Sequence, residues 1–138
     1  MSEYDSKWHN SMEGSVNYSY YNPDYFLING KANPDPSSDP KTAVTARKNQ
    51  TVLVRLINAG YLVAVVSLGG LPFKVVASDG RPLPSTVTTT SQIIAPGERY
   101  DLLVTFSSTG NWLAEVKYLN WYNQTLRGKA NTKITATL

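Results

Sequence analysis

The residue types that could do chemistry in this 138-residue chain are scarce, above all those that ligate metals or attack substrates. The sequence contains no cysteine, which excludes a disulfide, a thiolate nucleophile and any cysteine-ligated zinc, iron or blue-copper centre. It contains one histidine, His9, in a polar segment near the start of the chain. A site of two or three imidazoles cannot come from this chain alone. A Ser-His-Asp hydrolase is not expected either, because the sequence has no Gly-x-Ser-x-Gly turn.

Carboxylates offer the next possible chemistry, since a pair facing a cleft can act as general acid and base. The candidates are Asp24, Asp79, Glu98, Asp101 and Glu115. Asp79 precedes Gly80, Asp24 follows Pro23 and Glu98 follows Pro96-Gly97, and these neighbours favour turn roles with local hydrogen bonds. We therefore interpret these residues as turn residues and not as a catalytic pair.

Two other motifs could bind ligands, and each is incomplete. Asp35 and Asp39 lie in the Pro-rich loop from Asn33 to Pro40, but two carboxylates fall short of the roughly six oxygens that Ca²⁺ requires. Gly69-Gly70 lacks the Gly-Lys-Ser/Thr that completes a phosphate-binding loop, so we expect a tight turn there.

Aromatic residues are plentiful, with three Trp and nine Tyr, and they suggest a binding surface. Trp121-Tyr122 and the cluster from Tyr18 to Tyr25 could stack on sugar rings if they are exposed. A free-standing carbohydrate- or protein-binding module therefore stays open as an alternative function. The 13 basic residues never form a run longer than two, so a nucleic-acid partner is not expected. No run of roughly 18 apolar residues predicts a membrane span, and no signal peptide is expected at the start of the sequence.

Short apolar runs separated by Gly, Pro, Asn and Asp predict the elements that must position these residues. Strands of this length and spacing are typical of an all-β sandwich or barrel. In Thr51–Asn58 and Tyr100–Phe106 one face is wholly apolar and the other is mixed, which suggests that a partner covers the outer face. The predicted strands are 24–29, 43–47, 51–58, 62–68, 73–78, 92–95, 100–106, 112–118 and 133–138.

Four motifs then resemble a known family. They are Asp24–Lys31 (DYFLINGK), Leu56–Gly60 (LINAG), Phe73–Gly80 (FKVVASDG) and Ala95–Val104 (APGERYDLLV). In this order and spacing they are similar to the cupredoxin domains of multicopper oxidases, and the chain resembles the middle (second) domain of a three-domain, laccase-like enzyme. The resemblance implies a cupredoxin-like Greek-key β-sandwich over residues 22–138, with residues 1–21 as an extended lead-in or interdomain linker.

The departure from this family concerns the copper ligands. Copper-bearing final domains carry His-Pro-x-His-Leu-His-Gly-His between the second and third motifs, where this chain has AVVSLGGL at 64–71. Ala64, Ser67 and Gly69 thus occupy family copper-ligand positions, and none of them can bind copper. The late His-Cys-His segment is missing as well. The resemblance therefore implies a domain with no catalytic, cofactor-binding or metal-binding residues of its own.

The resemblance also implies what the parent protein does. A parent with copper in neighbouring cupredoxin domains would oxidise phenolic, aromatic-amine or metal-ion substrates and reduce O2 to water, outside the cell or in the periplasm. This chain would bridge the copper-bearing domains and have no oxidase activity alone. Leu71, Trp121 and Tyr122 are candidates for lining the substrate entrance.

Overall fold

The computed structural model describes residues 1–9, 21–32 and 39–138, and within them every regular element except one short helix is a β-strand. Each of the nine predicted runs contains a strand, so the all-β prediction is confirmed. The elements are β1 (Ser2–Tyr4), α1 (Ser6–His9), β2 (Tyr25–Ile28), β3 (Lys31–Ala32), β4 (Val44–Arg47), β5 (Thr51–Ile57), β6 (Val63–Leu68), β7 (Phe73–Ser78), β8 (Arg81–Thr89), β9 (Ser91–Ile94), β10 (Arg99–Thr105), β11 (Gly110–Leu119) and β12 (Leu126–Thr137).

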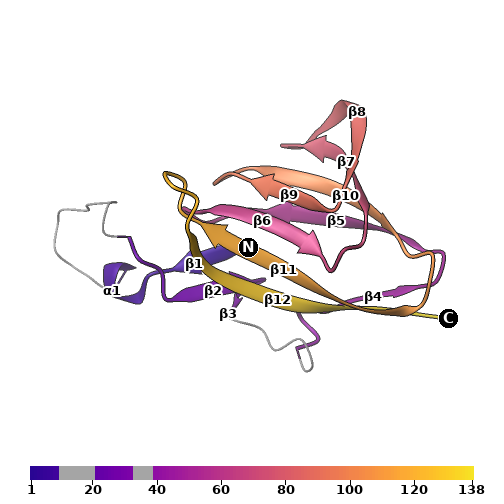
Figure 1. Ribbon diagram of the computed structural model, residues 1–138, viewed down its shortest axis with the longest axis horizontal. Coiled ribbons are helices and arrows are strands. Elements are labelled where there is room, and N and C mark those ends of the chain that lie inside the picture. Colours follow the sequence, from indigo (N-terminus) through magenta and orange to yellow (C-terminus); the bar gives the residue numbers. More distant parts are fainter. Residues whose placement is uncertain (10–20, 33–38) are drawn as a thin grey trace.

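The strands form two large sheets and one small sheet (Figure 1). One large sheet has the order β5-β10-β7-β8 and the other has the order β4-β12-β11-β6-β9. Neighbouring strands are antiparallel except β4 and β12, which run parallel. Sequence neighbours such as β5 and β6 lie in different sheets, so the chain crosses between the two layers several times. This crossing pattern makes the domain a sandwich of interleaved strands.

The core lies between the two large sheets and follows the period-two alternation of the sequence. On β6, Ala64, Val66 and Leu68 are buried, while the residues between them are only partly buried. On β10, Leu102 and Val104 are buried in the same way. Because successive side chains of a strand point to opposite faces, one register places each apolar set inside.

The small sheet β1-β2-β3 closes one end of this core. Phe26 of β2 packs against Tyr118 of β11 with ring centroids 5.2 Å apart, and the Tyr118 hydroxyl donates to the Leu27 carbonyl at 3.0 Å. A Cβ at Gly128 would lie 2.2 Å from the Phe26 ring, so only glycine leaves room for this ring. The first resemblance motif, which contains Phe26, is therefore a packing element.

Three turns carry the backbone conformations that their residues favour. Asn29-Gly30 and Asp79-Gly80 have positive φ at both positions, as is usual in two-residue hairpin loops. At Pro96-Gly97 the φ of Gly97 is 81°, and the Glu98 N–H donates to the Ala95 carbonyl at 3.0 Å, as in a type II turn.

The turn from β5 into β6 is fixed by Asn58, which is completely buried. Its Nδ2 donates to the carbonyls of Leu62 (2.8 Å) and Ile94 (2.9 Å). Its Oδ1 accepts from the Gly60 N–H at 3.1 Å. The backbone of Asn58 also pairs with Glu98 and Gly97, so the LINAG and APGE motifs meet here. These two motifs form a structural corner between the sheets.

The sequence did not predict β1, β3, β8 or α1. Strand β8 contains Pro82 and Pro84 and lies at the edge of its sheet, where prolines are tolerated better than in an inner strand. Strand β1 and helix α1 both lie within residues 1–21, and β1 pairs with β2 through Glu3 and Phe26. The first residues of the lead-in therefore join the small sheet, and the division at residue 22 stays a prediction.

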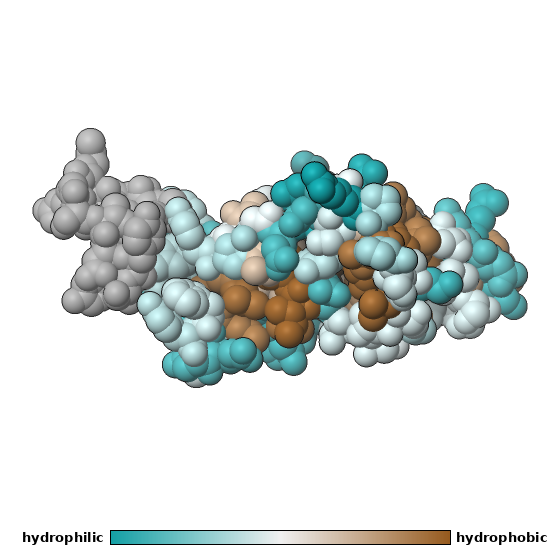
Figure 2. Space-filling model, turned by 90° about the horizontal axis from the view of Figure 1, so that it is seen from above, coloured by the Kyte–Doolittle hydropathy of each residue, from teal (hydrophilic) through white to brown (hydrophobic). Residues whose placement is uncertain are grey.

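The outer face of the β5–β10 pair is mixed, as the alternation indicated. Leu53 and Ile57 are 47% and 53% exposed, and between them Arg55 pairs with Asp101 at 3.7 Å. Figure 2 shows two hydrophobic areas at the surface on one side of the molecule, with hydrophilic residues around them. Single exposed apolar residues are common in soluble domains, so these areas by themselves identify no partner.

The Asn58 corner gives the first testable prediction. Asn58→Ala should lower the free energy of unfolding by about 2–4 kcal/mol, because it leaves two buried carbonyls and one N–H without partners. Asn111→Ala is the matched control: Asn111 is exposed and accepts one hydrogen bond, from the Thr135 hydroxyl, so its loss should cost under about 1 kcal/mol. Urea unfolding of the two variants measures both costs, and equal costs would contradict the role of Asn58.

Candidate functional site

The three positions at which the resemblance predicts copper ligands lie on β6 and in the turn after it. Ala64 is completely buried in the core, whereas Ser67 lies on the opposite face of the strand, in register with Ser91 and Glu115. Gly69 follows the strand in a left-handed conformation with a φ of 66°. The three positions therefore do not face a common point within this chain.

Gly69 also has no space for a side chain. A Cβ at this position would lie 2.9 Å from Trp112 Cβ and 3.0 Å from the Leu113 nitrogen, which are groups that cannot swing away. A Cβ on the neighbouring Gly70, with a φ of 88°, would meet nothing within 4 Å. The predicted tight turn is confirmed, and packing of β11 against it occupies the place where a ligand side chain would begin.

The five candidate carboxylates are each held by a local partner. Three accept from backbone N–H groups and a fourth pairs with an arginine. Asp79, Glu98 and Asp101 lie near the start of β10, whereas Asp24 and Glu115 lie elsewhere in the fold. The contacts are Asp24 Oδ1 with the Ser6 N–H (2.9 Å), Asp79 Oδ1 with the Arg99 N–H (2.9 Å), Glu98 Oε1 with the Ala95 N–H (2.7 Å), Asp101 with Arg55 (3.7 Å), and Glu115 with Lys117 and Lys129 (both 3.7 Å). Each of the five carboxylates therefore has a structural partner in the fold.

Glu3 is a buried carboxylate that no pattern in the sequence marks. It is 6% exposed, and its Oε1 accepts from the N–H groups of Tyr61 and Leu62, the latter at 3.0 Å, and from the Tyr21 hydroxyl at 3.4 Å. Its Oε2 lies so close to Gly60 that a Cβ there would be 2.0 Å away. Glu3 thus attaches β1 to the loop between β5 and β6, the same loop to which the Asn58 side chain bonds. Neither periodicity nor a motif marks a single glutamate near the chain start.

Burial raises the pKa of the Glu3 carboxyl, because removal from water penalises the charged form. The hydrogen bonds from Tyr61, Leu62 and Tyr21 oppose this increase without cancelling it. Asp24 is the opposite case: its exposed carboxylate accepts from the Ser6 hydroxyl and N–H, and these bonds lower its pKa. The pKa of Glu3 is therefore above its ordinary value and the pKa of Asp24 is below its ordinary value.

The aromatic candidates lie on the hairpin between β11 and β12. Trp121 and Tyr122 stack with ring centroids 4.0 Å apart and planes 23° apart, and they are 61% and 79% exposed. Leu71 follows β6 at the opposite end of the β6–β11 pair, because Leu119 is in register with Val63 and Ala114 with Leu68. The structure therefore brings Trp121 and Tyr122 together and places Leu71 apart from them.

The donor set does not fit a copper centre. Among residues 1–9, 21–32 and 39–138, no three His, Cys, Asp or Glu side chains gather in a group that could hold a metal ion. The side chain of His9, like Asp35, lies outside the described residues. In the part of the chain that the structure describes, no helix is long and apolar enough to cross a membrane.

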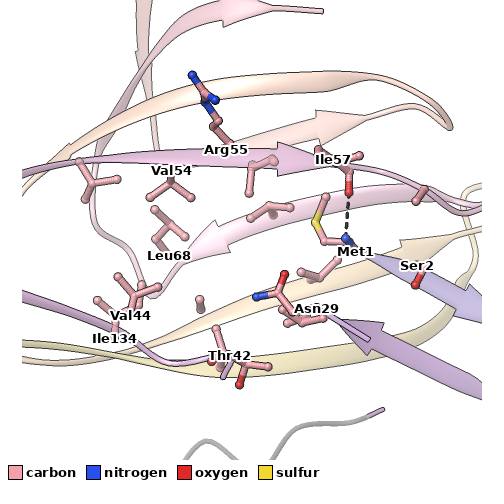
Figure 3. A pocket seen from close by; sticks show the side chains of 18 of the residues that line it. Met1, Ser2, Asn29, Thr42, Val44, Val54, Arg55, Ile57, Leu68 and Ile134 are labelled. Carbon is pink, nitrogen blue, oxygen red and sulfur yellow. Dashed lines mark hydrogen bonds between the residues drawn. The ribbon is translucent and has the colours of Figure 1, made fainter. Parts of the chain in front are cut away.

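A cavity of about 430 Å³ lies between the two large sheets, on the side where β5 faces β4 and β12 (Figure 3). Its walls are mostly core side chains such as Val54, Leu68 and Ile134. The sequence pattern gave no sign of this cavity, because alternation places apolar residues inside without fixing how closely the sheets approach.

Comparisons with known proteins agree with the fold and with the motifs. Residues 2–138 match the family model described as multicopper oxidase. Multicopper oxidase LPR1 homolog 5 of Oryza sativa subsp. japonica is 33% identical over 104 residues, which are 72% of this chain and 15% of that protein. Multicopper oxidase LPR2 of Arabidopsis thaliana is 36% identical over 93 residues, or 64% of this chain and 15% of that protein.

Solved structures give the same result for the fold. The blue copper oxidase from Nitrosomonas europaea matches with a TM-score of 0.70 and 25% identity over 94% of this chain and 40% of that chain. The McoA multicopper oxidase from Aquifex aeolicus matches with a TM-score of 0.64 and 17% identity, covering 91% of this chain and 28% of that one. The predicted cupredoxin-like sandwich is confirmed. The chain spans about 15% of the length of the plant relatives it matches.

Gly69 gives a prediction with a control next to it in the sequence. Gly70→Ala should lower the free energy of unfolding by about 1 kcal/mol, the cost of a left-handed alanine. Gly69→Ala carries the same backbone cost and adds contacts with Trp112 and Leu113, so we expect about 2–3 kcal/mol. Thermal or urea unfolding compares the two variants. Equal destabilisation would show that the turn can accept a side chain.

Glu3 gives a prediction about pH. Because its pKa is raised by folding, the stabilisation that it contributes is complete below the unfolded pKa and is lost as the pH rises through the folded pKa. Relative to Glu3→Gln, the wild type should therefore lose stability as the pH rises over that window and then stay level. Urea unfolding between about pH 4 and pH 8 measures the difference.

Asp24→Asn is the control of opposite sign. The pKa of Asp24 is lowered, so its contribution is present above the unfolded pKa and is lost as the pH falls. The wild type should therefore gain stability relative to Asp24→Asn as the pH rises. The same direction for both variants would contradict the assignment of Glu3.

Proposed function

This chain belongs to the multicopper oxidase family, and we propose that it is a copper-free middle domain of a three-domain, laccase-like oxidase. In that role it holds the copper-bearing cupredoxin domains of the same parent at a fixed separation. Its relatives are several times longer than this chain, which supports a parent with further domains. The domain itself supplies rigidity and surface, and no redox chemistry.

The observation that carries this proposal is what occupies the three positions where the resemblance predicts copper ligands. Ala64 is packed in the core, Ser67 lies on the other face of β6, and Gly69 has no space for a side chain. A histidine at Ala64 would have to displace the core, and one at Gly69 would meet Trp112 and the β11 backbone. These two positions support a scaffold role, because packing contacts fill the places where ligand side chains would lie.

The parent's chemistry follows from its family and from copper that its other domains would hold. We propose that the parent takes single electrons from phenolic, aromatic-amine or metal-ion substrates and reduces O2 to water. We also propose that it works outside the cell or in the periplasm. The exposed apolar residues Leu53 and Ile57 on the outer face of β5 suit contact with a neighbouring domain.

The stacked pair Trp121 and Tyr122 is our candidate for part of the substrate entrance. Two exposed rings on a hairpin offer a flat apolar platform for an aromatic substrate. Leu71 lies at the other end of β6, so it would line an entrance only together with a neighbouring domain at that end. Trp121 with Tyr122 is therefore one candidate for the substrate entrance, and Leu71 is a second, separate candidate.

A free-standing binding module is the second candidate function, and the same stacked pair favours it. Exposed aromatic rings on a β-sandwich can stack on the faces of sugar rings. In that case the domain would have no redox role, and Trp121 would bind a carbohydrate or a protein partner.

Copper analysis tests the scaffold proposal. The 138-residue chain, titrated with copper, should develop no intense thiolate–copper absorbance and should retain no stoichiometric copper after dialysis. The parent chain that contains it should retain copper and consume O2 with a phenolic substrate. Stoichiometric copper in the isolated chain, or a parent sequence without a His-Cys-His segment, would overturn the proposal.

Polysaccharide binding separates the two candidate functions. Affinity of the isolated chain for a polysaccharide, lost in Trp121→Ala and kept in the control Tyr25→Ala, would favour the binding module. Tyr25 is a fair control because it is also an exposed aromatic residue, but it lies on β2 in the small sheet.

A further inference from the structure

Strand β5 lies at an edge of its sheet, and among residues 1–9, 21–32 and 39–138 no strand pairs with its free side. The other edge strands of the two large sheets carry features that discourage pairing: β8 contains two prolines, and β4 and β9 have four residues each. Strand β5 has seven residues, five of them apolar, with no proline and no bulge against β10. Such a long, regular edge is a template for a further strand.

The backbone groups of β5 alternate between β10 and the free side. The Asn58 N–H, just past the strand, donates to the Glu98 carbonyl at 3.1 Å, so Asn58 belongs to the bonded set of this antiparallel ladder. Bonded pairs recur at every second residue, and the even-numbered residues of β5 therefore bond to β10. The N–H and C=O groups of Leu53, Arg55 and Ile57 then point toward the free side, where a strand could bond to them.

Met1 already bonds to the end of this free side. Its amino group donates to the Ile57 carbonyl at 2.8 Å (Figure 3), and its carbonyl accepts from the Ala59 N–H at 2.9 Å. Ile57 and Ala59 are the two neighbours of Asn58, and a residue that bonds to both neighbours of the residue opposite is paired in parallel. The Met1 side chain lines the cavity, so it points between the sheets as the buried Asn58 does. A strand that ends at Met1 would therefore run parallel to β5 in a fixed register.

The sandwich is not closed on this side. Val54 points between the sheets but is only partly buried, whereas Leu102, opposite it on β10, is completely buried. The cavity of about 430 Å³ lies against Val54, and Met1 and Ser2 line it as well. Burial lowers the pKa of the Met1 amino group, because the charged form is removed from water. A peptide N–H in its place would keep the bond to the Ile57 carbonyl without a buried charge.

We propose that the segment of the parent that leads into residue 1 adds a parallel strand to the free side of β5 and closes the cavity between the sheets. The register at Met1 places the residues two, four and six before it opposite Leu56, Val54 and Val52, facing the cavity. These three residues should be apolar, and those between them, on the outer face, should be polar. The inference rests on the proposed function, since a middle domain follows another domain. It makes the connection to that domain part of a sheet, and therefore rigid.

Two extensions of the 138-residue chain test this register. One adds Val-Thr-Val-Thr-Val-Thr directly before Met1, which directs the valines into the cavity. Its matched control adds Thr-Val-Thr-Val-Thr-Val, the same composition shifted by one residue. The first extension should slow amide hydrogen exchange at Leu53, Arg55 and Ile57 about fivefold or more, as expected for an added hydrogen bond, and the control should not. The even-numbered amides of β5, which already bond to β10, should change less. Equal protection by both extensions, or by neither, overturns the inference.

Hydrogen exchange of the parent is the second measurement. The amides of Leu53, Arg55 and Ile57 should exchange about fivefold or more slowly in the parent than in the isolated 138-residue chain. A parent that retains copper but shows no slower exchange would overturn this inference and leave the scaffold proposal standing. A parent without copper would overturn the scaffold proposal instead, and the added strand would then stand or fall by the two extensions.

Discussion

The fold depends on satisfying the buried backbone where β5 leaves one sheet and β6 enters the other. A chain that crosses between layers must break its ladder there, and the freed carbonyls and N–H groups are inside the protein. Asn58 meets this need from one side with three hydrogen bonds, and Glu3 meets it from the other through Tyr61 and Leu62. These hydrogen bonds join the end of β5 to the start of β6 in the other sheet, and Glu3 attaches the small sheet to the same loop.

The motifs that relate this chain to multicopper oxidases are, in this domain, structural. LINAG and APGE form the corner through Asn58, Gly97 and Glu98, and DYFLING inserts Phe26 beside Gly128. They form turns and packing contacts that this sandwich uses without any metal. At Gly69, one of the positions where the resemblance predicts a copper ligand, Trp112 packs closely against the backbone.

The interior and the surface differ in how strictly their polar and apolar groups are matched with partners. Most buried polar side chains have partners, and the atoms without one among the described residues are Glu3 Oε2, Asn131 Oδ1 and Thr132 Oγ1. On the surface, the exposed rings of Trp121 and Tyr122 and the apolar residues of β5 carry little cost singly.

The sequence by itself determined the strand-rich architecture, the positions of nine strands, the glycine turns and the lack of a thiolate–copper site. These follow from alternation, turn chemistry and residue type, which are local properties. Only the tertiary structure decided that Glu3 is buried against Gly60, that Leu71 lies apart from Trp121, and that a cavity remains beside Thr132. Strand β8, with its two prolines, also needed its place at a sheet edge to be recognised. Such features depend on which distant segments meet and how closely two sheets approach, and no local pattern encodes that distance.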